Sequence, residues 1–289
     1  MAGGGLGAPG TEALTPVTYK ERIQFDGWEL TEGTVRNWEV RDGFDDVAAM
    51  VGDNLTVANR SGEVWRPKTL GPGKFTVQLW LAGKTITQAQ DAFRTLLRAT
   101  YRPHRLVRVT RTMASGEVVY CDAEVAGTVS PTHLGQAAYR ASITFTVPSG
   151  MWRSDIVYEQ STPVGAKLNQ GLYLDDLAPS TAPLETLEFT IYGRITNPYL
   201  TDNTDGGYVD KFNYAGTIPS GGWLRFNAEF WSVDAGGFSY ANNLVNPTGR
   251  RLMTISAARP GDRPSVILSG TNGDSKTHLK VRGRRHYLC

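Results

Sequence analysis

Alternation of apolar and polar residues with a period of two is the feature that most limits how this chain can fold. Within residues 74–81 every second side chain is apolar, beginning with Phe75, which is typical of a half-buried β-strand. Residues 117–129 predict another strand, interrupted by a turn or bulge near Asp122 or Gly127. Further strands are predicted over 105–110, 138–147, 187–193, 223–231, 251–257, 264–269 and 276–288. The sequence therefore predicts a mostly β protein.

One segment has a different period. Residues 87–100 carry apolar side chains at helical spacing, and Thr87 with Gln90 fits a capping box at the start. Pro103 ends the pattern. The apolar stripe consists of Ala89, Ala92, Phe93, Leu96 and Leu97. We expect one helix in an otherwise β-rich first half.

The length indicates two domains, because 289 residues are roughly twice the ~150-residue prior for one domain. Residues 148–186 interrupt the strand pattern and are interspersed with prolines, which is typical of a linker. The Gly-rich turns of the second half are typical of an all-β sandwich. We therefore divide the chain into a flexible extension over 1–16, a first domain over 17–155 and a second domain over 156–289.

The overall charge and the cysteine content exclude several classes of protein. The chain has 30 Lys and Arg residues and 28 Asp and Glu residues, which gives a net charge of +2. This value excludes a protein whose whole surface is positively charged and binds nucleic acid. The two cysteines, Cys121 and Cys289, form neither a disulfide scaffold nor a metal cluster. The segment MAGGGLGAPG lacks the pattern of a signal peptide, and no apolar run approaches ~20 residues. We expect a soluble protein made in a cytoplasm, without membrane insertion.

Catalytic and cofactor motifs are incomplete in this sequence. Gly5 to Gly10 satisfies G-x-G-x-x-G, but no strand precedes it and Pro9 lies inside it. The Gly-Pro-Gly-Lys run at 71–74 lacks the first glycine of a phosphate loop, since Lys68 stands at that position. The sequence has no G-x-S-x-G, H-E-x-x-H or C-x-x-C motif. We therefore expect neither an enzyme nor a cofactor or metal site.

Local charge is the strongest physical signal. Residues 26–53 contain eight acidic and two basic residues, a net charge of −6, and residues 60–111 contain eleven basic and two acidic residues, a net charge of +9. The opposite charges either pair within one subunit or form complementary faces of a head-to-tail ring. Nucleic-acid binding is a rival use of the basic segment, but no recognisable module accompanies it. The candidate ring-interface residues are Asp42, Asp45, Asp46, Asp53, Arg66, Lys68, Arg102, Arg105 and Arg108.

The strand over 223–231 offers a different function. Its polar face would carry two tryptophans that frame hydrogen-bonding groups, an arrangement that could stack on a sugar ring. In the other interpretation these tryptophans cover a neighbouring loop or subunit, since aromatic residues are enriched at interfaces. The candidate sugar-contact residues are Trp223, Arg225, Asn227, Glu229 and Trp231.

Short motifs follow one another along the chain in an informative order. They are GDN at 52–54, GEVWRPK at 62–68, FTVP at 145–148, MW at 151–152, GRITNPYL at 193–200 and YL at 287–288. In this order they resemble the distal tail proteins of long-tailed bacteriophages, over about residues 20–288. The Gly-x-Ile-Thr-Asn-Pro stretch is the best single piece of that resemblance.

The resemblance implies an N-terminal β-barrel with one α-helix, similar to tail-tube subunits, followed by a galectin-like β-sandwich. It implies a homohexameric ring that joins the tail tube protein to the tail-tip hub protein, with genomic DNA passing through the lumen unbound. The loop through 43–65 matches a region that in such proteins often reaches around a neighbour. The protein would be a structural part of the virion, at the distal end of the tail, on which receptor-binding proteins could dock.

A carbohydrate-binding adhesin acting through the second domain is the alternative function. The galectin-like domain seldom keeps sugar-binding residues in the family that the chain resembles. The motifs H-x-N-P-R and W-G-x-E-x-R are also missing here, which weakens this alternative.

Overall fold

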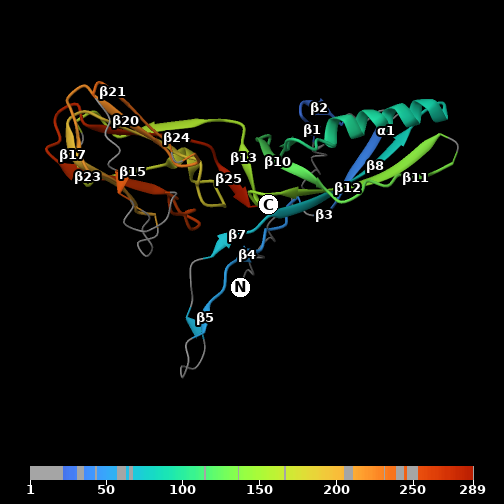
Figure 1. Ribbon diagram of the computed structural model, residues 1–289, viewed down its shortest axis with the longest axis horizontal. Helices are drawn as coiled ribbons and strands as arrows, with labels where there is room; N and C mark the ends of the chain where they lie inside the picture. The colour runs from blue at the N-terminus through green and yellow to red at the C-terminus, as the bar shows by residue number, and fades with distance from the viewer. Residues whose placement is uncertain are drawn as a thin grey trace, which may run out of the picture.

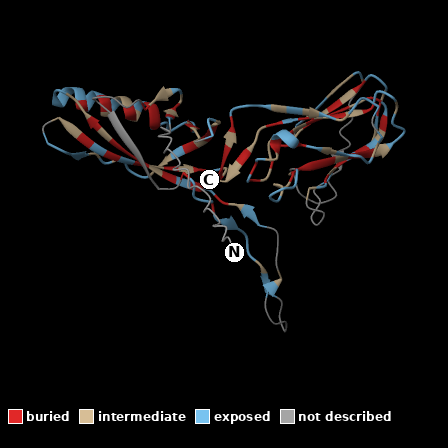
Figure 2. Cartoon of the chain, turned by 180° about the vertical axis from the view of Figure 1, so that it is seen from behind, coloured by how far each residue is buried: buried red, intermediate tan, exposed pale blue. Residues whose placement is uncertain are grey.

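The molecule consists of two β-rich lobes with a hairpin arm that leaves the chain between them (Figures 1 and 2). This computed structural model describes residues 22–30, 36–42, 44–56, 63–64, 68–113, 115–135, 137–165, 167–204, 211–230, 232–238, 244–245 and 253–288. The predicted extension over 1–16 lies outside the described residues.

The first lobe is built on an antiparallel sheet. Its strand order is β2 (Trp28–Glu29), β1 (Ile23–Phe25), β9 (Val107–Thr112), β10 (Val118–Ala126), β12 (Ala138–Val147), β8 (Gly73–Ala82) and β3 (Arg36–Asp42). β8 and β12 pair along their whole length, from Gly73 opposite Val147 to Ala82 opposite Ala138. Two short elements are added at the side, β11 (Thr132–His133) on β12 and β13 (Met151–Ser154) on β10. The strands predicted over 74–81, 105–110 and 138–147 are thus confirmed.

One helix covers the apolar face of this sheet. α1 (Ile86–Thr100) contacts β8 and β12 and buries Ala89, Ala92 and Leu96 against them. Beneath it the rings of Phe25, Phe75 and Phe145 stack in a row, with centroids 5.3 and 5.0 Å apart. Helix and sheet therefore share one core, and the helix predicted over 87–100 is confirmed.

The start of α1 differs from the prediction. Thr85, not Thr87, is the N-cap, because its backbone is still extended and its hydroxyl accepts a hydrogen bond from the Gln88 backbone N–H at 3.3 Å. The Gln88 side-chain oxygen accepts in turn from the backbone N–H of Lys84 at 2.9 Å. The capping box placed on Thr87 and Gln90 was therefore wrong by two residues.

The sheet of the first lobe is open. In the strand order of the described residues β2 and β3 lie at the two ends and do not pair with each other. A sheet must bury its apolar face, and here α1 supplies that cover without closure. The described part of a single chain therefore forms a helix-covered open sheet and not the closed barrel implied by the resemblance.

The second lobe consists of two antiparallel sheets packed about one core. The first sheet has the order β14 (Tyr158–Ser161), β24 (His278–Gly283), β16 (Glu188–Tyr192), β20 (Trp223–Asn227) and β21 (Ser232–Gly236). The second has the order β15 (Gly171–Tyr173), β23 (Ser265–Thr271), β17 (Ile195–Asp202), β18 (Lys211–Tyr214) and β22 (Leu244–Val245), with β19 (Thr217–Ile218) added to β17. Phe189, Phe212 and Phe226 meet between them, with ring centroids 4.2 to 6.2 Å apart. The 3-10 helix η1 (Asp175–Leu177) contributes Leu177 to this core.

The strands predicted over 117–129 and 223–231 begin and end at other residues in the structure. β10 runs without a break through Asp122, which pairs with Arg108 of β9, and ends just before Gly127. β20 ends at Asn227, because the Asn227 side chain accepts a hydrogen bond from the Phe230 N–H at 3.1 Å and the chain turns there. Phe230, which an unbroken strand over 223–231 would place on the same face as the buried Phe226, is consequently 72% exposed.

The predictions near the C-terminus also need adjustment. Within 251–257 the described residues form only an isolated bridge, between Ile255 and Leu184. Residues 276–288 hold two strands, β24 and β25 (His286–Leu288), instead of one. β23 agrees with the strand predicted over 264–269, and β16 with the one over 187–193.

The last strand joins the two lobes. Of the strands in the described residues, β25 pairs with β13 of the first sheet, Trp152 lying opposite Tyr287. The Tyr287 hydroxyl donates to the Glu117 carboxylate at 2.6 Å, and Arg285 approaches the same carboxylate at 3.5 Å. Arg284 donates to the backbone carbonyls of Ser154 and Asp155. A strand from the sequence range 156–289 thus completes the sheet of the first lobe.

The hairpin arm is made of short paired strands. β4 (Met50–Val51) pairs with β7 (Thr69–Leu70), and farther out β5 (Leu55–Thr56) pairs with β6 (Glu63–Val64). Figure 1 shows it projecting away from both lobes. Its base is held by backbone contact, since Gly71 donates to the Ala49 carbonyl at 2.8 Å and a Cβ at Gly150 would collide with the Gly71 carbonyl. The arm therefore starts from a tightly packed base and extends into solvent.

Candidate functional site

Asp26 collects several of the basic residues that the sequence singled out. It lies in the turn between β1 and β2 and accepts both guanidinium N–H groups of Arg105, the shorter bond being 2.6 Å. Arg102 approaches to 3.7 Å, and the backbone N–H of Arg108 donates at 3.1 Å. Burial alone would raise the pKa of Asp26, but these hydrogen bonds and charges outweigh it and hold the pKa below its ordinary value. This acidic residue is thus paired inside its own chain.

Arg108 has its own partner on the neighbouring strand. Its guanidinium makes two hydrogen bonds to the Asp122 carboxylate, at 3.0 and 3.2 Å, and lies 4.2 Å from the centre of the Tyr120 ring. The hydrogen bond to Asp122 raises the pKa of Arg108 above its ordinary value. About half of the Arg108 side chain is exposed, so this pair contributes only ~0–1 kcal/mol to stability.

Asp45 ties the base of the arm to the first sheet. Its carboxylate accepts a hydrogen bond at 2.9 Å from Arg111, whose side chain is buried in β9. Arg111 also donates to the Phe44 carbonyl at 3.2 Å and lies over the Phe44 ring. Asp45 thus fixes the segment that enters the arm.

The remaining candidate interface residues do not gather at one place. Asp46 and Asp53 are exposed and lie on or near the arm, and Lys68 lies beside β7 next to Gly52. Asp42 is the last residue of β3, but its side chain lies outside the described residues, as does the whole of Arg66. The three arginines Arg102, Arg105 and Arg108 therefore have intramolecular partners, while Asp46, Asp53 and Lys68 face solvent.

The candidate sugar-contact residues are divided between two small hollows. One lies on the β14–β24–β16–β20–β21 sheet, and the other is also lined by Tyr120 and Arg153 of the first lobe. Trp223 and Arg225 line one of about 220 Å³, and Asn227 and Glu229 line the other, of about 210 Å³. Trp231 lies outside the described residues.

Most of these side chains already have partners in the chain. Arg225 is bonded to Asp234 at 2.6 Å and lies over the Trp223 ring, and Glu229 is bonded to Arg153 at 2.9 Å. The indole of Trp223 also packs so closely on Gly236 that a Cβ there would collide with it. In the described part of this strand, Trp223, Arg225 and Glu229 are thus already engaged within the chain.

The apolar surface of the arm is not predicted from the sequence. Val47 is 60% exposed, Met50 64% and Val51 53%, and Leu55 farther out is also exposed. Large apolar side chains that gather on one exposed element mark a surface that binds another molecule. No periodic pattern in the sequence signals this, since the residues lie in a hairpin without a core of its own.

The described residues contain no group of three or more His, Cys, Asp or Glu side chains placed to hold a metal ion. None of their helices has both the length and the apolar character needed to cross a membrane. Cys121 is buried in the core of the first lobe.

Comparison with known proteins identifies the fold. No family model matches the sequence, and no curated protein does. The chain is similar to the crystal structure of the SPP1 Dit (gp 19.1) protein, described as a paradigm of the hub adsorption apparatus in phages that infect Gram-positive bacteria. That likeness has a TM-score of 0.62 at 12% sequence identity and covers 93% of this chain and 100% of the other. The two chains therefore share a fold across both lobes.

The baseplate of phage P2, in its activated conformation with calcium, also contains a similar chain. The TM-score is 0.39 at 12% identity, with 92% of this chain and 98% of the other covered.

Proposed function

We propose that this chain is a structural ring subunit at the tip of a phage tail. The observation that carries the proposal is the fold shared with SPP1 Dit, because it extends over both lobes and over the whole of that protein. Two unrelated small domains would not be expected to match together in this order. The proposed role is structural. In agreement with it, Arg102, Arg105 and Arg108 are bonded to Asp26 and Asp122 of their own chain.

In the proposed ring, six copies contact each other head to tail. The first lobe suits this arrangement because its sheet has open edges at β2 and β3, and an open edge can be extended or covered by a neighbouring chain. The barrel-like wall would then belong to the ring and not to one subunit. DNA would pass through the lumen without specific binding, and the second lobe, as a galectin-like sandwich, would face outward.

The arm is the proposed contact between neighbouring copies. Val47, Met50 and Val51 are more than half exposed in the single chain. Burial of such side chains against a neighbouring copy would stabilise the interface by ~1.5–3 kcal/mol each. Asp53 and Lys68 would set the orientation of the arm on its neighbour. Arg102, Arg105 and Arg108 contribute little to this contact, because their partners lie in their own chain.

The proposed partners follow from the position of such a ring. Its two faces would meet the tail tube protein and the tail-tip hub protein, and peripheral or receptor-binding proteins would dock on the sandwiches. The site of action would be the distal end of the tail in the virion, after synthesis in the host cytoplasm.

Native mass spectrometry of the purified full chain tests the proposal. We expect a species of six copies, and we expect the double variant Met50→Glu, Val51→Glu to be mostly monomeric because charge on the arm opposes its burial. Val164→Glu is the matched control, since Val164 is 67% exposed but lies away from the arm. A chain that stays monomeric at every concentration, and in the presence of tube protein, would refute the ring.

A further inference from the structure

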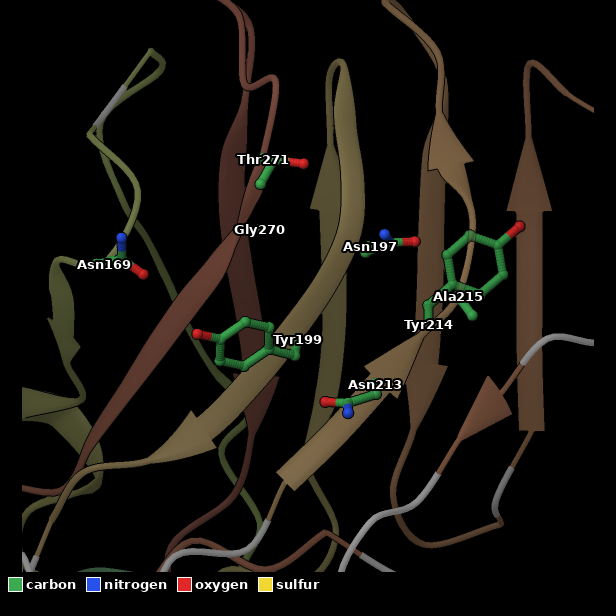
Figure 3. Close-up of a pocket in the computed structure, with 8 residues that line it drawn as sticks. All are labelled: Asn169, Asn197, Tyr199, Asn213, Tyr214, Ala215, Gly270 and Thr271. Atoms are coloured by element: carbon green, nitrogen blue, oxygen red, sulfur yellow. The ribbon is translucent and has the colours of Figure 1, made fainter.

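A hollow lies on the sheet of the second lobe opposite the candidate sugar strand. It has a volume of about 510 Å³ and opens on the outer face of β17, β18 and β23 (Figure 3). Tyr199 projects outward there because it alternates with the buried Leu200, and Asn213 lies directly opposite it on β18. The residues that line the hollow are Asn169, Asn197, Tyr199, Asn213, Tyr214, Ala215, Gly270 and Thr271.

A β-bulge produces this hollow. β17 pairs with β23 at Thr196 opposite Thr271 and again at Tyr199 opposite Ser269, so β17 contains one extra residue between these pairs. The extra residue follows from Asn197-Pro198, because proline cannot donate to a ladder and Asn197 takes a left-handed backbone with φ 49°. Bulges re-aim side chains and bend the strand, and this one turns Asn197 toward the hollow in Figure 3.

Gly270 forms part of the wall of the hollow and lies opposite the bulge. A Cβ there would lie 2.9 Å from the buried Ile195 side chain and 3.1 Å from the Thr196 carbonyl. The backbone of β23 therefore passes the bulge at a distance that leaves no room for a side chain on its core side.

The chemistry of the lining is neutral and rich in amides. None of the eight lining residues carries a charge at neutral pH, and three are asparagines, each of which can donate and accept hydrogen bonds. The side-chain oxygen of Asn213 is buried and has no hydrogen-bond partner among the residues that the structure describes. Tyr199 adds an aromatic ring that is 37% exposed. An unsatisfied acceptor beside an exposed ring is the combination that a bound polar ligand would complete.

We propose that this hollow binds a neutral saccharide. The C–H face of a pyranose would pack on the Tyr199 ring, and neighbouring hydroxyls would donate to Asn213 and exchange hydrogen bonds with Asn197. Phosphates and carboxylates fit poorly, because the lining offers no cation to pair with them. This site is distinct from the strand over 223–231, and it goes beyond the proposed ring function, which does not require any ligand.

Saturation-transfer NMR on the full chain tests the site with cellobiose, lactose and N,N′-diacetylchitobiose as probes. We expect transfer to at least one of them, and about tenfold weaker binding for Tyr199→Ala because the ring contact is lost. Asn213→Leu, similar in size but without the acceptor, should weaken binding as well. Tyr173→Ala is the matched control, since Tyr173 is an exposed tyrosine of the same sheet outside the hollow. It should bind like the unmodified chain.

Two outcomes would overturn the proposal: transfer to none of the three probes, or binding that Tyr199→Ala and Tyr173→Ala change equally. Equal binding of sialyllactose and lactose would contradict the argument from a neutral lining. Each variant is first checked for an unchanged thermal transition, so that loss of fold is separated from loss of the site. Saccharide binding is measured independently of the oligomeric state. A negative binding result therefore does not contradict the proposed ring, and a monomeric chain does not contradict the proposed saccharide site.

Discussion

At the scale of single residues, His286 is the buried ionisable group on which the junction between the lobes depends. Its Nδ1 lies 2.7 Å from the Pro183 carbonyl and its Nε2 lies 2.8 Å from the Thr186 hydroxyl. A carbonyl can only accept, so Nδ1 carries the proton and a neutral Nε2 accepts from Thr186. Burial lowers the pKa of His286 to about 4 from 6.5, and the positive charge of Arg153 acts in the same direction.

His286 should make the protein sensitive to mild acid. Between pH 6.5 and about 4 the unfolded chain binds a proton that the folded chain does not, so the free energy of unfolding falls as the pH falls through this range. The full effect is on the order of 3 kcal/mol and is absent above pH 7. Urea unfolding from pH 7 to 4.5 measures it. His286→Asn should flatten the dependence and His278→Asn, near the surface, should keep it; parallel curves for the unmodified chain and His286→Asn would contradict the assignment.

The charged residues of the first lobe show what could be foreseen at this scale. Segment charges of opposite sign were visible in the sequence, but their partners were not. Asp26 finds Arg105 because the turn after β1 lies beside the loop after α1, 79 residues away in the chain. Asp122, the partner of Arg108, belongs to neither charged segment. Such pairs depend on strand register, which segment sums do not contain.

At the scale of elements, α1 offers a direct test of its start. Thr85→Ala should lower the free energy of unfolding by ~1 kcal/mol, because the Gln88 backbone N–H then loses its acceptor. Thr87→Ala, an exposed position in the first turn, should change it by less than ~0.5 kcal/mol. Urea denaturation of both variants measures the difference. A larger loss for Thr87→Ala than for Thr85→Ala would restore the start expected from the sequence.

Elements with a periodic pattern and a core partner were predictable, and the others were not. The strand over 138–147 was predicted to the residue, because alternate side chains of β12 are buried against α1 and β8. The arm was missed as an element, since its short strands pair with each other and bury nothing. The hollow could not be foreseen either, because the bulge at Asn197 exists only in the pairing of β17 with β23, some 70 residues farther along.

At the scale of the whole molecule, β25 couples the two lobes mechanically. It continues from β24 of the sandwich into the sheet of the first lobe, and Glu117 there receives both Arg285 and Tyr287. Burial and the neighbouring Glu117 raise the pKa of Tyr287 well above its ordinary value, so the hydroxyl stays a donor at any physiological pH. The orientation of the second lobe on the first is therefore set by a paired strand and not by a flexible linker alone.

A chain that lacks residues 284–289 should keep both cores but lose this coupling. We expect amide hydrogen exchange to speed up at least tenfold in β13, because its partner strand is gone, while α1 exchanges at its original rate. Hydrogen exchange measured by mass spectrometry gives the rates for β13 and α1 separately. Unchanged protection of β13 would mean that the pairing with β25 does not stabilise the first sheet.

The pairing of β13 with β25 also has a consequence for the order in which the protein matures. Arg284 and its acceptor Ser154 stand 130 residues apart in sequence, with the whole sandwich between them. During synthesis the first sheet therefore leaves the ribosome with β13 still lacking its partner strand β25. The pairing can form only after the sandwich has been translated. If the proposed ring assembles only from subunits in which β25 is paired with β13, incompletely translated chains would be excluded from it without a separate quality-control step.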